Sequence, residues 1–250
     1  MLVPELKRFV REAATDEATR VIVFESAVPG FFAAHVDASY GADPVGFMAL
    51  GANDSGHDGL NPMQHLVASV RALPQVTIAK LRGYLRGGGN ELAMATDLRY
   101  AAAGETWLGQ IEGRMGIVPG GGGTQLLARA IGRSRTLEAV LTADLYDTAT
   151  AQLYGWVTRA VPAGDLDAVV GAIAQRIGSR LPSQILAAKA AVDPATGGDR
   201  LDDDLRVEAA ALAHVYPAPP SVEKRMNAAL ADGLQTPRNE RDLEAFLDRY

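Results

Sequence analysis

The sequence predicts an α/β protein with parallel strand pairing and a helical C-terminal region. Short runs rich in β-branched residues alternate with amphipathic helical patterns as far as residue 192, which is typical of parallel sheets. After a break at Ala195-Thr196-Gly197-Gly198, the pattern is helical and charged. We therefore expect a mixed core over residues 1–195 and a helical region over residues 196–250.

Hydrophobic spacing places the elements in order along the chain. A first helix is expected at 4–18, where Leu6 and Phe9 share one face. The run Val21–Phe24 fits a short buried strand, and Pro29-Gly30 predicts a turn. Residues 41–62, rich in Gly, Asp and Asn, predict a loop with little regular structure. Further helices are expected at 62–72, 90–96, 120–131, 134–143, 148–154, 166–177 and 183–192, and further strands at 76–79, 98–103 and 156–161.

Composition excludes several classes of protein. The 250 residues are 48% hydrophobic and 22% charged, as in ordinary globular domains. Cysteine is absent, which excludes disulfides and thiolate chemistry and favours a reducing, cytoplasmic setting. The net charge of −6 argues against nucleic-acid binding. No apolar run reaches the roughly 18 residues of a membrane span, and the N-terminus lacks signal-peptide features.

Two glycine runs, Gly87–Gly89 and Gly120–Gly123, are the most distinctive local feature. Neither fits the dinucleotide pattern G-x-G-x-x-G, and neither supplies the lysine of a P-loop. The chain also lacks the serine elbow and the zinc-binding H-E-x-x-H motif. The four histidines have no metal-ligand spacing, so no metal site is expected.

A glycine run that leads into a helix has another use, because it exposes backbone N–H groups that can stabilise an oxyanion. Glu91 lies in the first turn after the first run, and Glu112 lies shortly before the second. Two carboxylates near such donors suit acid–base chemistry on a polarised carbonyl. The spacing alone favours a simpler alternative, in which Glu91 stabilises a helix N-terminus and Glu112 is a surface acid.

Several longer motifs stand in unbroken order along residues 5–192. They are Phe32-Ala33-Ala34-His35-Val36-Asp37, Leu73–Ala79, Gly83–Ala93, Asp97–Arg99, Leu108–Glu112, Gly116–Gln125 and Tyr154–Pro162. Together they resemble the enoyl-CoA hydratase/isomerase (crotonase) superfamily. The resemblance implies a spiral of ββα turns followed by C-terminal helices, a homotrimer or hexamer, an acyl-CoA thioester substrate, and no metal or redox cofactor.

The resemblance also implies a catalytic site. The backbone N–H groups of Val36 and Gly88 would form the oxyanion hole, and Glu91 and Glu112 would be the catalytic carboxylates. Further contacts to the substrate or CoA are expected at Ala34, His35, Asp37 and Gly87. Having both carboxylates favours hydration or dehydration. The alternatives are isomerisation, C–C bond cleavage or cyclisation on the same oxyanion hole, or a non-catalytic scaffold that kept the fold.

Four features depart from the family pattern. His35 replaces a glycine, and its imidazole could contact the ligand or simply fill space. Arg86 stands where an apolar residue is common and could pair with an acid that the sequence does not identify. Ile111 replaces a frequent proline, and the spacing between the two carboxylates is one residue longer than usual. The chain begins almost at the first helix, where the family has further strands that shape the CoA cleft.

Overall fold

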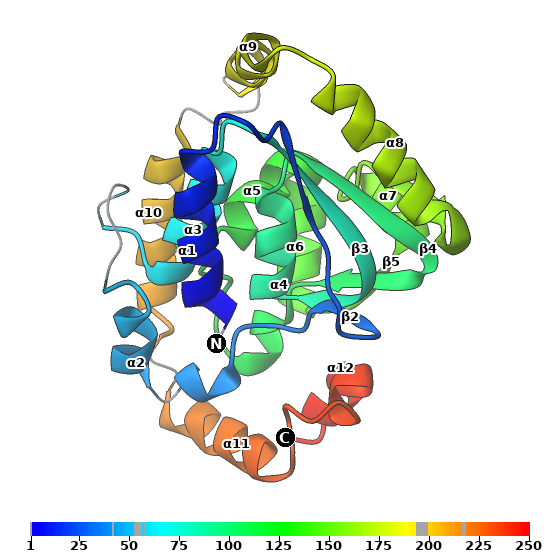
Figure 1. Cartoon of the computed structure of the whole chain (residues 1–250). Coiled ribbons are helices and arrows are strands. Elements are labelled where there is room, and N and C mark those ends of the chain that lie inside the picture. Colours follow the sequence, from blue (N-terminus) through cyan, green and yellow to red (C-terminus); the bar gives the residue numbers. More distant parts are fainter. Residues whose placement is uncertain (1, 42, 53–56, 58, 194–199, 217–218) are drawn as a thin grey trace.

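One mixed sheet organises the computed structural model, which describes residues 2–41, 43–52, 57, 59–193, 200–216 and 219–250. Within these residues the sheet has six strands (Figure 1). β3 and β4 pair at its centre, β1 and β2 lie along the free edge of β3, and β5 and β6 lie along that of β4. All pairs are parallel except β4 with β5, which confirms the predicted fold class. The strands are β1 (Val21–Phe24), β2 (Phe31–Ala33), β3 (Val76–Arg86), β4 (Leu98–Gly109), β5 (Tyr146–Asp147) and β6 (Arg159–Pro162).

The two central strands are longer than the sequence predicted. The predicted runs 76–79 and 98–103 cover only the first parts of β3 and β4. The pairing between these two strands shifts register after Leu81 and resumes at Gly83. Gly83 has φ +73°, and a Cβ there would lie 2.1 Å from the carbonyl oxygen of Gly30. β1 and β6 pair with the first halves of the central strands, whereas β2 and β5 pair with the second halves. The shift therefore divides the sheet into two successive parts.

Helices cover both faces of the sheet (Figure 1). α1, α3, α4 and α5 contribute to the main hydrophobic cluster on one face. α8 covers the other face, where Leu166 and Val170 pack against Ile78 and Tyr100. The helices of the core region agree with the predicted positions to within a few residues. They are α1 (Leu2–Ala14), α3 (Pro62–Arg71), α4 (Gly88–Ala95), α5 (Gly123–Ile131), α6 (Arg133–Thr142), α7 (Thr148–Tyr154), α8 (Leu166–Gly178) and α9 (Pro182–Val192).

The segment expected to be an irregular loop, residues 41–62, contains a helix, so that prediction was wrong in part. α2 spans Pro44–Ala49, with the proline in its first turn. The side chain of Asp43 caps it by accepting a hydrogen bond from the N–H of Gly46 at 2.8 Å. The ring of Phe47 packs against Tyr40, with 5.9 Å between centroids. Local capping and one aromatic contact thus order a stretch that shows no hydrophobic period. Residues 42, 53–56 and 58 of this segment, and the whole of the predicted break at 195–198, lie outside the described residues.

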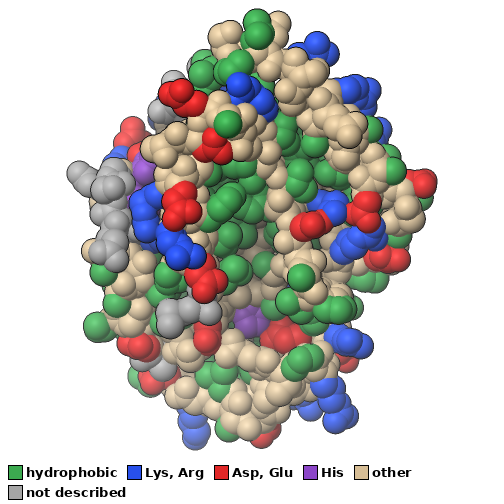
Figure 2. Space-filling model, viewed as in Figure 1, with side chains coloured by type: hydrophobic (Ala, Val, Ile, Leu, Met, Phe, Trp, Pro, Cys, Tyr) green, Lys and Arg blue, Asp and Glu red, His purple; other side chains and the backbone are tan. Residues whose placement is uncertain are grey.

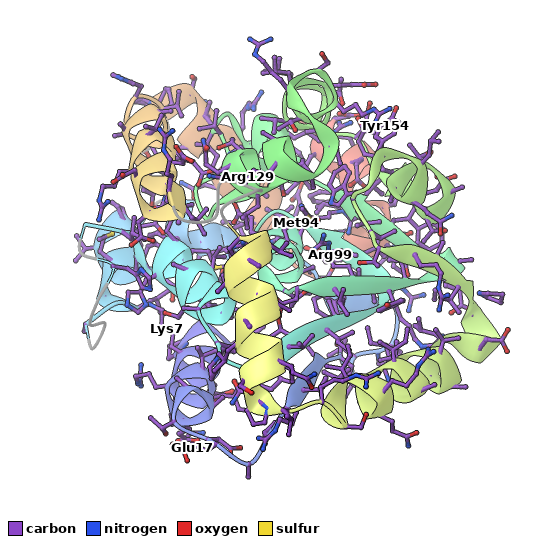
Figure 3. All side chains as sticks on the ribbon, turned by 90° about the horizontal axis from the view of Figure 1, so that it is seen from above. Lys7, Glu17, Met94, Arg99, Arg129 and Tyr154 are labelled. Carbon is purple, nitrogen blue, oxygen red and sulfur yellow. The ribbon has the colours of Figure 1, made fainter. Side chains whose placement is uncertain are left out.

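The C-terminal region is helical, as expected, and folds back onto the core. It comprises α10 (Leu201–Ala213), α11 (Pro220–Ala231), a 3-10 helix η6 (Asn239–Asp242) and α12 (Leu243–Leu247). Seen from above, α10 lies beside α5, and Arg129 of α5 pairs with Asp204 of α10 (Figure 3). α11 and α12 lie below the core and share a small hydrophobic cluster with Ile111 (Figure 1). None of the described helices has the length and apolarity that a membrane crossing requires.

Candidate active site

Three parallel strands deliver the predicted site residues to one edge of the sheet. β2, β3 and β4 all end there, and parallel strands gather the segments that follow their carboxyl ends. These segments line one cavity of about 140 Å³. It brings together seven of the eight predicted residues: His35, Val36, Asp37, Gly87, Gly88, Glu91 and Glu112.

Ala34 is the predicted residue that does not line this cavity. Its carbonyl oxygen accepts the N–H of Arg86 at 3.1 Å, so it joins the ends of β2 and β3. It lines instead a second hollow of about 750 Å³ between α1 and the sheet. Figure 2 shows hydrophobic side chains gathered in that hollow; Leu6, Phe24 and Phe32 are among its lining residues.

Two backbone amides face the cavity without a partner. Within the described part of the chain, the N–H groups of Val36 and Gly88 donate no hydrogen bond. α4 begins at Gly88, so that amide lies at the positive end of a helix. A Cβ at Gly88 would lie 2.4 Å from Cγ2 of Val36, which shows how closely the two segments approach. This closeness explains why the position is glycine.

Glu91 is held by the second glycine run. Its side chain is buried, and Oε1 accepts the N–H groups of Gly121 at 2.8 Å and Gly123 at 2.9 Å. A Cβ at Gly121 would lie 2.2 Å from Oε2 of Glu91, so a side chain there would displace the carboxylate. The second glycine run, Gly120–Gly123, therefore holds the carboxylate of Glu91, which follows the first run.

Glu112 reaches the same cavity from a different element, the 3-10 helix η2 (Ile111–Met115). It is buried, and its Oε2 has no hydrogen-bond partner among the described residues. A Cβ at Gly87 would lie 2.8 Å from its Oε1, and Gly87 has φ +46°, so glycine is favoured at this position as well. A carboxyl oxygen that is buried and unpaired is available to a water or a ligand.

Burial and mutual repulsion keep a proton on these two carboxyl groups. Burial raises the pKa of Glu112 to about 7, with a further contribution from the charge of Glu208. Burial, followed by the charges of Glu112 and Glu208, raises the pKa of Glu91 well above its usual range. Both carboxyl groups therefore keep a proton to higher pH than an ordinary glutamic acid does.

Glu208 is a third buried carboxylate, which the sequence analysis missed. It projects from α10 and accepts the N–H of Gly122 at 2.6 Å, the N–H of Thr124 at 2.9 Å and the hydroxyl of Thr124. The four amides from residue 121 to residue 124 therefore alternate between Glu91 and Glu208. One sequence signal was present, because Glu208 falls on the same helical stripe as Leu201 and Leu205.

The C-terminal region closes the cavity, which the sequence also did not show. Its lining residues there are Leu212, Tyr216, Glu223, Met226 and Asn227. The hydroxyl of Tyr216 donates to the carbonyl oxygen of Tyr40 at 2.6 Å. This bond joins the C-terminal region, residues 200–250 and hereafter the tail, to the segment that follows β2.

Acids of the same tail also pair with Arg86 and His35, the two residues that depart from the family pattern. Arg86 pairs with Glu244, which identifies the acid that the sequence left open. The ring of His35 lies between the carbonyl oxygen of Val36 and the carboxylate of Glu240 while also lining the cavity.

Two free amides and two buried carboxyl groups that line one cavity suit acid–base chemistry on a carbonyl compound. Among the described residues, no group of three His, Asp or Glu side chains is placed to hold a metal ion. The chain belongs to the enoyl-CoA hydratase/isomerase family, whose model matches residues 1–228. The fold is the crotonase fold with C-terminal helices.

A solved structure and curated sequences both support this assignment. A candidate enoyl-CoA hydratase from Streptomyces avermitilis has a crystal structure that matches with a TM-score of 0.91 and 43% identity, covering 99% of this chain and 88% of that one. Human mitochondrial methylglutaconyl-CoA hydratase is 34% identical over 63% of this chain and 44% of its own length. Mouse mitochondrial enoyl-CoA hydratase domain-containing protein 2 is 32% identical over 77% of this chain and 64% of its own length. The chain thus spans about half the length of the curated relatives.

Proposed function

We propose that this protein is an enoyl-CoA hydratase, which adds water reversibly across the C2=C3 double bond of an acyl-CoA thioester. The observation that carries the proposal is that two buried carboxyl groups, Glu91 and Glu112, line one cavity. Burial raises the pKa of both, which suits them to exchange protons near neutral pH. Hydration takes one proton from water and gives one to carbon, so two such groups suit it. The family and the printed names of the relatives support a CoA thioester as substrate.

In this mechanism the thioester oxygen accepts hydrogen bonds from the N–H groups of Val36 and Gly88. As water attacks C3, negative charge develops on that oxygen, and each donor stabilises it by roughly 3–4 kcal/mol. The developing enolate then needs a proton at C2. The two amides are well suited to this role because neither is used elsewhere in the described structure.

The proton transfers follow from the carboxyl pair. Glu91 takes a proton from the attacking water, and Glu112 delivers one to C2. Each well-placed acid or base contributes about 10²–10⁴-fold. The proton count of the pair is unchanged after a turnover, and water restores its distribution. Elimination runs the same steps backwards, with Glu112 taking the proton from C2 and Glu91 protonating the leaving hydroxyl.

The acyl chain would lie against apolar side chains. Phe47, Met63, Ile117, Val118 and Met226 line the cavity, so a hydrocarbon chain fits it better than a charged one. Glu223, from α11, also lines this cavity.

Replacing either carboxylate tests the proposal. Glu91→Gln and Glu112→Gln should each lower kcat for hydration of crotonyl-CoA by about 10²–10⁴-fold while CoA-ester affinity stays within a few-fold. The assay follows the loss of the conjugated thioester absorbance, and mass spectrometry checks the addition of water. Glu105→Gln, at an exposed acid of β4, is the matched control. Full activity in either active-site variant would contradict the role of that residue, and a product that has moved its double bond without gaining water would identify an isomerase.

A further inference from the structure

Two cationic side chains stand just before the two oxyanion amides, and both pair with one short C-terminal segment. His35 immediately precedes Val36, and Arg86 comes two residues before Gly88. Nε2 of His35 lies 3.0 Å from Oε1 of Glu240. Arg86 donates from Nε and Nη2 to the two oxygens of Glu244, at 2.7 and 3.0 Å. The two acids are four residues apart, on η6 and α12.

The surroundings of His35 define its hydrogen bonds. Its Nδ1 lies 2.6 Å from the carbonyl oxygen of Val36, which can only accept, so Nδ1 carries a proton. Its Nε2 faces a carboxylate, and both side chains of the pair are at least 93% buried, being 5% and 7% exposed. An imidazolium that donates at both nitrogens satisfies this arrangement. The bond to its own neighbour's carbonyl fixes the turn that presents the N–H of Val36.

The charges around His35 favour the same state. Burial lowers the pKa of His35, but hydrogen bonding and charge attraction from Glu240 outweigh it, so the pKa is raised overall. Arg86 opposes the positive charge, while Glu112 and Asp37 also interact with it electrostatically. The ring therefore lies among groups from β3, η2, η6 and its own loop, and the tail supplies its direct counterion.

Arg86 is also held in place, by contacts of both its side chain and its backbone. Its side chain is fully buried and also lies over the ring of Tyr84, 4.4 Å from the centroid. Its backbone N–H donates to the carbonyl oxygen of Ala34 at 3.1 Å, directly joining the two segments that carry the donor amides. A buried charge needs its partner, so the pair with Glu244 resists displacement.

We propose that the tail segment Asn239–Leu247 acts as a clamp that sets the spacing of the Val36 and Gly88 amides, with Glu240 and Glu244 as positioning residues. The inference rests on the proposed function in one respect, that these amides bind a thioester oxygen. It explains both departures at His35 and Arg86 together. Oxyanion donors stabilise charge only when they are fixed in advance, and a displacement of about 1 Å can cost about 10²-fold in rate.

Neutralising each acid of the clamp tests it. In Glu240→Gln and Glu244→Gln, kcat should fall about 10- to 100-fold. Asp242→Asn is the matched control, because Asp242 lies between the two acids with an exposed side chain. The second readout is the absorption of bound cinnamoyl-CoA, which moves to longer wavelength when the donors polarise its carbonyl. This shift should shrink in both variants and not in the control. Affinity for free CoA, which has no acyl carbonyl, should stay unchanged in all three.

The outcomes separate the clamp from a general structural role. Wild-type kcat and spectral shift in both folded variants would overturn the proposal, as would a loss of affinity for free CoA equal to that for cinnamoyl-CoA. If Glu244→Gln does not fold, Glu244→Asp keeps the charge but shortens the reach, and the same readouts apply. The wild-type protein separates the two proposals: a spectral shift without hydration rejects the hydratase and leaves the clamp standing, whereas binding without a shift rejects the clamp.

Discussion

Glu112 links the chemistry of the site to the stability of the protein. Burial raises its pKa in the folded chain to about 7, whereas an unfolded chain releases this proton at the ordinary value of 4.5. Between these two pH values the folded state binds the proton more tightly, so the free energy of unfolding falls as pH rises and levels off above about pH 7. The carboxylate for which we propose a catalytic role thus costs stability above neutral pH.

Glu112→Gln should remove this cost. The variant should be more stable than wild type at pH 8, by up to about 3 kcal/mol, and close to wild type near pH 5. Urea unfolding at the two pH values measures the difference, and Glu105→Gln again serves as the control. An equal difference at both pH values would show that Glu112 is not protonated in the folded protein above its ordinary pKa.

The sequence revealed some site residues and not others for a physical reason. Glu91 and Glu112 were singled out beside the glycine runs, where glycine permits close approach of a backbone amide or a carboxylate, and the family resemblance then assigned both to the site. Glu208, Glu240 and Glu244 act through contacts with residues more than 80 positions away, as in the pair of Glu208 with Gly122. Nothing local marks such partners, apart from an acid placed on an apolar helical stripe.

At the scale of elements, the N-terminus of α5 is the junction of the site. The successive amides of residues 121–124 bind Glu91 from α4 and Glu208 from α10, so one helix end holds two carboxylates. The charge of Glu208 also raises the pKa of Glu91 and Glu112. α10 therefore contributes to the protonation of the pair without touching the cavity through this residue.

Glu208→Gln should shift the pH dependence of the reaction. The acid limb of kcat reflects ionisation of the carboxyl pair, and loss of a neighbouring negative charge lowers both pKa values, so the limb should move to lower pH. Stability should fall by about 0.5–2 kcal/mol, because the helix end loses an anionic cap. Asp203→Asn, on the exposed face of α10, should leave the limb in place. An unmoved limb in Glu208→Gln would show that its charge does not reach the pair.

The elements themselves were predictable to different degrees. The helices of the core region other than α2 were placed to within a few residues from their hydrophobic spacing. Half of each long strand was missed, because Gly83 and the half-exposed Lys80, Arg82 and Tyr84 interrupt the apolar run. β2 has three residues and β5 has two, and both are defined by their pairing with the long strands. No local sequence pattern could therefore predict them.

For the molecule as a whole, buried apolar residues form three clusters. The largest lies between the sheet and α1, α3, α4 and α5, and the second lies under α8. The third consists of tail residues from α11 to α12 together with Ile111. Ile111 is adjacent to Glu112, so the cluster that orders the tail also supports one of the two carboxylates.

Separate clusters allow the tail to open without unfolding of the core, and two matched truncations test this. Leu243→Ala, in the third cluster, and Leu166→Ala, in the second, each remove a fully buried leucine and should each cost about 2–5 kcal/mol. In Leu243→Ala, hydrogen exchange should speed up over residues 220–250 and kcat/KM should fall, because the cavity loses its tail wall and the counterions of His35 and Arg86. In Leu166→Ala, exchange should speed up around α8 while kcat/KM stays near wild type. Equal loss of activity in both would mean that the whole molecule unfolds as one unit, and the tail could not then act on the site independently of the core.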